Sequence, residues 1–175
     1  MTFIPRLIEP STTNQYYIVT SSGGLNECVE IENGSALPNC VGYAWGRIYE
    51  INKTRPNLST GNAGDWYNYN DGYSRVENPK LGAVMCFSKE NAHGHVAVVE
   101  QINDDGSITL SNSGYNYKRF YLTTMSKPYT LSGYQFQGFI YATNDSPTPT
   151  IKSKKKSSWI LYRRKKDDNL YKVRW

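Results

Sequence analysis

The sequence predicts an α+β domain, in which one amphipathic helix is followed by a run of antiparallel strands. Apolar residues recur at helical spacing from Val41 to Ile51, whereas β-branched, strand-like segments follow Pro79. The composition agrees, because the 175-residue chain contains 15 tyrosines and 14 glycines and few leucines. Helices and strands that are segregated along the chain are typical of α+β proteins. This length is sufficient for one domain with a hydrophobic core and a small appendage.

The helix is expected to begin at Pro38-Asn39 and to end near Asn52, before the loop that contains Pro56. Asn is a favoured N-cap residue, and Pro is well tolerated at a helix start. Cys40 then falls in the first turn, where free N–H groups and the positive end of the helix dipole favour a thiolate, the reactive form of cysteine. The alternative is that Cys40 is a small buried hydrophobic residue, as most free cysteines are.

The strands are expected to form a sheet around one tight turn. Asp104-Asp105-Gly106 has the Asp-Gly signature of a hairpin and joins two strand-like segments. The expected strands are 83–87, 95–102, 107–113, 119–122 and 136–142. Between the helix and this block, Gly61–Tyr69 has two readings: a short helix with Trp66 in the core, or an aromatic wall of a cleft.

Three cysteines, Cys28, Cys40 and Cys86, have spacings that fit no zinc-binding pattern. We expect neither a secretory leader nor a disulfide framework, because no basic segment followed by an apolar one opens the chain. Cys28 and Cys86 are therefore expected to be structural or incidental. Membrane insertion is not expected, because no apolar run approaches the length of a membrane span.

Charge and composition divide the chain into a main domain, residues 1–143, a linker, residues 144–150, and a tail, residues 151–175. The tail holds 10 Lys+Arg and 2 Asp+Glu, a net charge of +8, whereas the remaining 150 residues hold 10 and 13 and net −3. Trp159–Tyr162 and Leu170–Trp175 predict a basic β-hairpin. A lone hairpin is marginally stable, so it docks on the domain, pairs with a second copy as a homodimer, or stays mobile.

A cysteine nucleophile needs a general base, and the base needs a group that orients it. The chain has two histidines, His93 in a loop beside Gly94 and His95 at the start of a strand. Antiparallel pairing through the hairpin turn brings His95 opposite Leu110–Ser113, where Asn112 can accept a hydrogen bond from an imidazole nitrogen. The alternatives are an ordinary strand-end histidine and an asparagine that forms a turn.

Five blocks in this order resemble a CHAP domain, the cysteine, histidine-dependent amidohydrolase/peptidase family. The blocks are Asn39–Arg47, Gly61–Ala63 with Trp66, Lys80–Val84, Gly94–Glu100 and Phe136–Tyr141. The resemblance extends over roughly Tyr16–Tyr141. It is nearest to the N-terminal domains of phage endolysins that act on Gram-positive hosts, clostridial ones in particular.

The resemblance implies a papain-like fold that cleaves an amide bond of peptidoglycan, as an N-acetylmuramoyl-L-alanine amidase or an endopeptidase. It implies Cys40 as nucleophile, His95 as base and Asn112 at the third catalytic position, where relatives often carry Glu. Asn39 is a candidate oxyanion-hole donor beside the Cys40 N–H. No metal or organic cofactor is implied, because the segment where some relatives bind calcium has only one carboxylate here, that of Glu32.

The expected substrate contacts are Trp45, Asn62, Trp66 and Tyr115. We expect the protein to remain in the host cytoplasm until holin-type release and then to act on the cell wall, with the tail attracted to anionic teichoic polymers. An alternative function is a cell-wall-binding module without turnover. Nucleic-acid binding by the tail is the weakest reading, because the main domain is acidic and no nucleic-acid motif is present.

Overall fold

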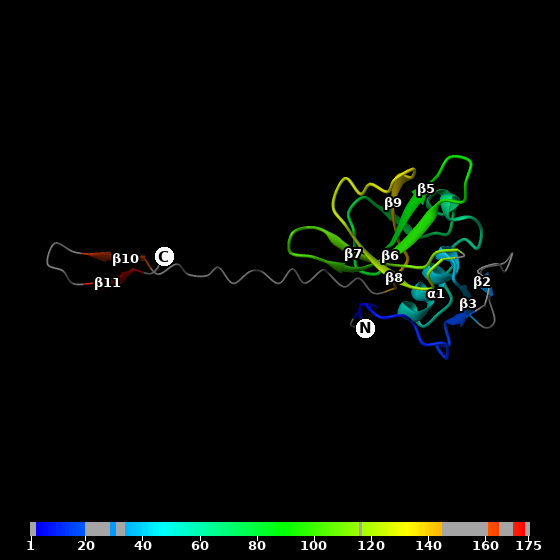
Figure 1. Ribbon diagram of the computed structural model, residues 1–175, viewed down its shortest axis with the longest axis horizontal. Coiled ribbons are helices and arrows are strands. Elements are labelled where there is room, and N and C mark those ends of the chain that lie inside the picture. The colour runs from blue at the N-terminus through cyan, green and yellow to red at the C-terminus, as the bar shows by residue number, and fades with distance from the viewer. Residues whose placement is uncertain are drawn as a thin grey trace.

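The computed structural model describes residues 3–19, 29–30, 34–115, 117–144, 161–164 and 170–173 (Figure 1). Cys28, the expected linker from residue 145 onward and most of the basic tail lie outside these ranges. The description below therefore concerns the main domain and two tail strands.

The α+β class is confirmed, with one α-helix and a six-stranded antiparallel sheet in the described residues. The helices are α1 (Cys40–Asn52) and the 3-10 helix η1 (Ala63–Asn68). The sheet has the order β4-β9-β5-β6-β7-β8. Its strands are β4 (Ser74–Val76), β5 (Val84–Ser88), β6 (His95–Ile102), β7 (Ile108–Asn112), β8 (Tyr121–Met125) and β9 (Gln135–Tyr141). The amphipathic helix expected to begin at Pro38-Asn39 and to end near Asn52 corresponds to α1.

A small second sheet precedes α1 and consists of β1 (Tyr17–Val19), β2 (Val29–Glu30) and β3 (Gly34–Leu37). β3 lies in the middle, parallel to β1 and antiparallel to β2. Since β3 ends three residues before Cys40, this sheet fixes the direction from which the chain enters the helix.

Helix α1 begins and ends as its sequence predicts. The Asn39 side chain caps it, since Oδ1 accepts from the backbone N–H groups of Val41, at 2.8 Å, and Gly42, at 3.3 Å. At the other end, Lys53 adopts a left-handed conformation with φ of 60° and donates its N–H to the Tyr49 carbonyl at 2.8 Å. The cap places Cys40 at the first helical position.

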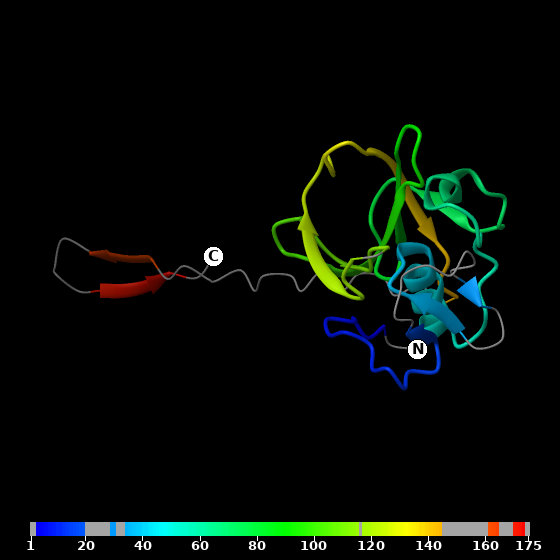
Figure 2. The same ribbon diagram turned by 45° about the vertical axis from the view of Figure 1, so that its right-hand side comes forward.

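The sheet separates two hydrophobic cores. On one face, Val84, Cys86, Val96 and Val98 pack against the apolar side of α1. On the other face, the connection between β8 and β9 covers a second cluster that includes Phe87, Leu110 and Phe139. Figure 2 shows the sheet strongly curled, with this connection (yellow) arching over the face away from α1. A side chain at the first residue of β6 therefore lies at the boundary between the helix and the curled sheet.

The β6–β7 hairpin contains a bulge at Glu100. Ile102 and Gln101 pair with Ile108 and Thr109, but Val99 then pairs with Leu110, so that Glu100 has no partner on β7. The bulged Glu100 side chain points to the helix side, where it is buried and ion-paired with Arg47, Nε to Oε1 at 2.9 Å. One extra residue in one strand shifts the register of everything beyond it.

Two tail strands form the expected C-terminal hairpin. β10 (Leu161–Arg164) pairs antiparallel with β11 (Leu170–Val173), with Leu161 opposite Val173 and Arg164 opposite Leu170. In the part of the chain that the structure describes, no helix has the length and apolar character needed to cross a lipid bilayer.

Candidate active site

Cys40 lies where the start of α1 meets the start of β6. Burial raises the pKa of its thiol above the usual value, while the backbone N–H groups of Val96, Val41 and Cys40 itself oppose that rise. The contact with Val96 places the sulfur beside the residue that follows His95. The sequence predicted a thiol activated by the helix terminus. In the structure those N–H groups are present, but burial outweighs them, which corrects that prediction.

His95 forms a hydrogen-bonded pair with Asn112. The His95 Nε2 atom lies 3.0 Å from Asn112 Oδ1. The Asn112 amide nitrogen in turn donates to the Leu110 carbonyl at 3.2 Å and to Thr123 Oγ1 at 3.0 Å. These two atoms hold the amide in one orientation, because a backbone carbonyl can only accept a hydrogen bond.

The fixed amide determines which imidazole nitrogen can act as a base. Asn112 presents its oxygen to His95, so the His95 Nε2 atom must carry the hydrogen and donate it. The Nδ1 atom then keeps its lone pair and is free to accept a proton. Burial lowers the pKa of His95, and the hydrogen bond that His95 donates to Asn112 partly offsets this by favouring the charged form. The imidazole is therefore neutral at neutral pH and has a basic Nδ1.

Asn39 is placed at the nucleophile, but most of its polar groups already have partners. Its Oδ1 caps the helix, and its backbone N–H donates to Ser113 Oγ at 3.0 Å. The side-chain Nδ2 of Asn39 takes no part in the helix cap and is the remaining side-chain donor. The oxyanion role predicted for Asn39 can thus be served only by this amide nitrogen, next to the Cys40 N–H.

Two of the expected substrate contacts belong instead to the core. Trp45 is 3% exposed and Trp66 is 0% exposed, and both pack in the cluster between α1 and the sheet. The Trp66 indole N–H donates to the Gly61 carbonyl at 3.2 Å. Side chains that are at most 3% exposed have almost no surface with which to contact a polymer, so the structure places both tryptophans in the core.

The other two expected contacts lie on the surface. Asn62 is exposed, and its Oδ1 lies 3.0 Å from His93 Nδ1, so the second histidine is joined to the start of η1. Tyr115 is 57% exposed, three residues beyond Asn112. Substrate binding by Asn62 and Tyr115 stays a prediction.

A close backbone contact fixes the chain directly before His95. Gly94 has a φ of +76°, and a Cβ atom there would lie 2.4 Å from the Gly64 nitrogen and 2.5 Å from the Phe87 carbonyl. The Gly64 N–H donates to the His93 carbonyl at 2.7 Å. Only glycine fits this position, and η1 is thereby held against the strand that carries His95.

A cavity of about 180 Å³ adjoins the His95–Asn112 pair. Its lining residues are Phe87, His95, Leu110, Asn112, Tyr121, Thr123, Met125, Leu131 and Tyr134. Thr123 and Tyr121 are residues at the site that sequence reasoning missed. The signal was weak, because the strand was expected at 119–122, whereas β8 runs from Tyr121 to Met125 and pairs Tyr121 with Asn112.

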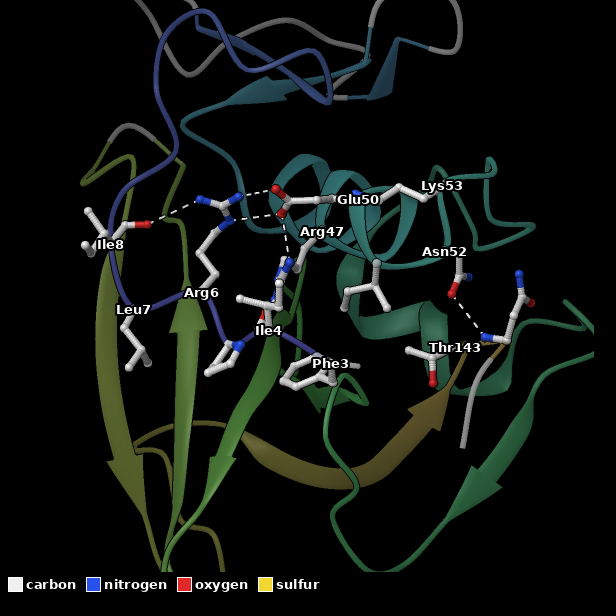
Figure 3. Close-up of a pocket in the computed structure, with 13 residues that line it drawn as sticks. Phe3, Ile4, Arg6, Leu7, Ile8, Arg47, Glu50, Asn52, Lys53 and Thr143 are labelled. Atoms are coloured by element: carbon white, nitrogen blue, oxygen red, sulfur yellow. Dashed lines mark hydrogen bonds and ion pairs between the residues drawn. The ribbon is translucent and has the colours of Figure 1, made fainter. Parts of the chain in front are cut away.

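A larger cavity, of about 570 Å³, lies at the opposite end of α1 between residues 3–8 and 143–144 (Figure 3). Its charged side chains are largely paired with one another. Arg6 and Arg47 both bind Glu50, and Arg47 also donates to the Ile4 carbonyl at 2.6 Å. The cavity has neither Cys nor His in its wall, so it offers no nucleophile and base for hydrolysis.

Metal binding finds no support in the ranges that the structure describes. They contain no group of three or more His, Cys, Asp or Glu side chains that could hold an ion. At the site itself, Cys40, His95 and Asn112 supply a thiol, an imidazole and an amide. A thiol beside an oriented imidazole can attack a carbonyl carbon and pass its proton on.

The chain is similar to known proteins over part of its length. Residues 31–114 match the family model of the CHAP domain. The staphylococcal secretory antigen SsaA of Staphylococcus aureus is 30% identical over 117 residues, which are 61% of this chain and 44% of that protein. The antigen ssaA2 of the same species is 37% identical over 81 residues, 45% of this chain and 28% of that protein. The chain thus spans less than half the length of these curated relatives.

A solved structure is also similar, that of an N-acetylmuramoyl-L-alanine amidase from Staphylococcus aureus. It is 28% identical, with a TM-score of 0.44, and the match covers 58% of this chain and 30% of that one. The segment that the family model matches contains Cys40, His95 and Asn112, of which His95 and Asn112 are hydrogen-bonded and Cys40 lies against the backbone of Val96. Residues 31–114 are thus similar to the CHAP domain.

Proposed function

We propose that this chain hydrolyses an amide bond of peptidoglycan with Cys40 as the nucleophile and His95 as the general base. The observation that supports this most directly is the hydrogen bond between His95 Nε2 and Asn112 Oδ1, 3.0 Å long, beside the capped start of α1. It leaves His95 Nδ1 as the proton acceptor. A neutral amide suits this role, because it fixes the tautomer and the orientation of the imidazole.

In the proposed reaction, His95 Nδ1 takes the proton of the Cys40 thiol while the sulfur attacks the carbonyl carbon of the substrate. The oxyanion that forms is stabilised by the Cys40 backbone N–H and Asn39 Nδ2. The C–N bond then breaks, and the proton on Nδ1 passes to the leaving nitrogen. Water next loses a proton to Nδ1 and attacks the thioester, the C–S bond breaks, and the proton returns to sulfur.

The directions of the two pKa shifts favour transfer of the thiol proton during attack over a preformed ion pair. Burial raises the pKa of Cys40 and lowers that of His95, so both groups are neutral in the resting site. The oxyanion donors gain a negatively charged partner only during the attack, when charge develops on the carbonyl oxygen of the substrate.

The test of the proposed function is the release of new amino groups from purified Gram-positive cell walls. Cys40→Ala and His95→Ala are each expected to abolish release while the melting temperature stays near that of the wild type. His93→Ala is the matched control, because it removes the other histidine, which is exposed and joined to Asn62. Cys86→Ala controls for loss of a buried thiol. Undiminished release by Cys40→Ala would refute the proposal.

The same assay separates the enzyme from the cell-wall-binding module that remains the alternative. A binding module sediments with walls and releases no amino groups. Mass spectrometry of the digest then distinguishes amidase from endopeptidase cleavage, because the two produce new muramic-acid ends and new peptide ends, respectively.

We further propose that the protein acts as an endolysin of a phage of a Gram-positive host, of the clostridial type, and reaches the wall after holin-type release. This rests on the blocks of sequence that resemble such enzymes. In the same proposal the basic tail binds anionic teichoic polymers. Comparative lysis of clostridial and staphylococcal walls tests the host range, and sedimentation analysis tests whether the chain forms a homodimer.

A further inference from the structure

We infer that the 180 Å³ cavity beside His95 receives the substrate residue that supplies the leaving amine, and that it selects an uncharged side chain. This inference rests on the proposed function and adds to it the chemical class of that residue.

The position of the cavity assigns it to one side of the bond that is cleaved. Its wall includes His95 and Asn112 but not Cys40. During the reaction the acyl carbon is bonded to Cys40, while the leaving nitrogen accepts its proton from His95. A substrate group that lies over the imidazole and away from the sulfur is therefore attached to the leaving nitrogen.

Tyr121 connects the cavity with the nucleophile. It lines the cavity, and its cross-strand partner on β7 is Asn112. Burial, followed by the nearby Cys40, raises the pKa of its phenol. Tyr121 is thus near both the cavity and the Cys40 thiol, which places the cavity close to the reacting atoms, on the imidazole side of the scissile bond.

The chemistry of the wall determines what the cavity accepts. Phe87, Leu110, Met125 and Leu131 are apolar, and the wall contains no Asp, Glu, Lys or Arg. His95 is the one wall residue with an ordinary pKa near neutrality, and burial lowers that pKa, so it is uncharged there. An ammonium or carboxylate group that entered would lose water without gaining a counter-ion.

The volume sets a loose upper limit on the size of the side chain. A cavity of about 180 Å³ accommodates a methyl group as readily as a branched aliphatic one. The selection is therefore by charge. Among the bonds of a cell wall, those whose nitrogen belongs to alanine or another neutral residue fit the cavity, whereas those whose nitrogen belongs to glutamate or a diamino acid do not.

The test uses the wall itself as substrate. Amino groups that the full-length protein releases are labelled with fluorodinitrobenzene, the digest is hydrolysed, and the labelled residues are identified. The expected result is labelling of alanine or another neutral residue. Labelling mainly of glutamate or a diamino acid would overturn the inference while the proposed function stood. Absence of any new amino group would instead refute the proposed function itself, and the inference with it.

A pair of variants on one strand tests the location. Met125 lines the cavity and Leu122, on the same strand, faces away from it and is exposed. Met125→Glu is expected to lower amino-group release at least tenfold, roughly the discrimination that one pocket contact gives, whereas Leu122→Glu stays within about twofold of the wild type.

The melting temperature of each variant shows whether a lower rate of release results from unfolding. If Met125→Glu does not fold, Leu131→Glu replaces it, since Leu131 is partly exposed and lies outside the sheet strands. A folded variant with an acidic side chain in the cavity and an unchanged rate of release would overturn the assignment of the cavity.

Discussion

Single side chains determine the state of the base. The Asn112 hydrogen bond favours the charged form of His95, whereas burial opposes it and lowers the pKa overall. The serines on either side of Asn112 are engaged elsewhere, because Ser111 Oγ donates to Glu100 and Ser113 Oγ accepts from the Asn39 N–H. Asn112 is therefore the residue of this strand end that is available to orient His95.

Two substitutions of Asn112 are expected to move the acid limb of the pH–rate profile in opposite directions. In Asn112→Ala the charged form of His95 loses its acceptor, so the pKa of His95 falls further and the limb moves to lower pH, with a loss in kcat of about tenfold. In Asn112→Asp the added negative charge favours the imidazolium, and the limb moves to higher pH. The measurement is kcat/KM against pH, and an unchanged profile in both variants would exclude Asn112 as the orienting group.

Thr123 is expected to act through Asn112. Thr123→Val keeps the shape of the side chain but removes the oxygen that accepts from Asn112 Nδ2 at 3.0 Å. We expect turnover to fall severalfold, with the acid limb displaced, because the amide can then rotate. Thr123→Ser keeps the oxygen, so both the turnover and the position of the acid limb are expected to be those of the wild type. Thr124→Val, at the neighbouring exposed position, is the control.

At the scale of secondary structure, the bulge in β6 determines which residues share a face. Opposed residues of antiparallel strands lie on the same face, and successive residues alternate. With the register of Gln101 and Thr109 continued, Asn112 would lie opposite Val98, on the helix side. The bulge at Glu100 moves Asn112 opposite Ala97, and so onto the face that carries His95.

The carboxylate of Glu100 is expected to be necessary for this register. It accepts from Arg47 Nε and Nη2, each at 2.9 Å, and from Ser111 Oγ at 2.8 Å, and it is buried. Glu100→Gln removes the fully buried one of the two carboxylates that pair with the Arg47 guanidinium and leaves the less buried Glu50, so the free energy of unfolding should fall by about 3 kcal/mol.

Chemical denaturation measures this, and Glu9→Gln is the control. Glu9 pairs with Arg119 at 2.8 Å with both side chains more than 40% exposed, and such surface pairs contribute at most about 1 kcal/mol. Equal effects of the two substitutions would contradict the structural importance given to the bulge.

At the scale of the whole molecule, charge separates the two parts of the chain. The tail, residues 151–175, carries a net charge of +8, and the rest of the chain carries −3. Removal of the tail is expected to weaken binding to intact walls mainly at low ionic strength, because charge attraction is screened within about 8–10 Å at physiological salt. Hydrolysis of soluble muropeptides, which lack teichoic polymers, should be nearly unchanged.

The measurements are co-sedimentation with walls across a salt series and hydrolysis of muropeptides. Equal losses on walls and on muropeptides, together with a lower melting temperature or a smaller oligomeric mass, would indicate that the tail packs on the domain or on a second copy.

Local sequence determined the parts of the site that depend on near neighbours. The cap at Asn39, the first-turn position of Cys40 and the turn at Asp104-Asp105-Gly106 follow from short-range preferences, and the structure confirms each of them. Because the chain has two histidines and one of them opens a strand, the sequence also led to His95, and the hairpin led to Asn112.

Tertiary structure alone decided the rest. In the bulge that brings Asn112 to the face of His95, Glu100 is paired with Arg47, which lies 53 residues away in the sequence. Burial, which raises the pKa of Cys40 and removes Trp45 from the surface, is set by how the sheet packs on α1. Local preferences carry no information about such long-range contacts, because burial and register are properties of several segments at once.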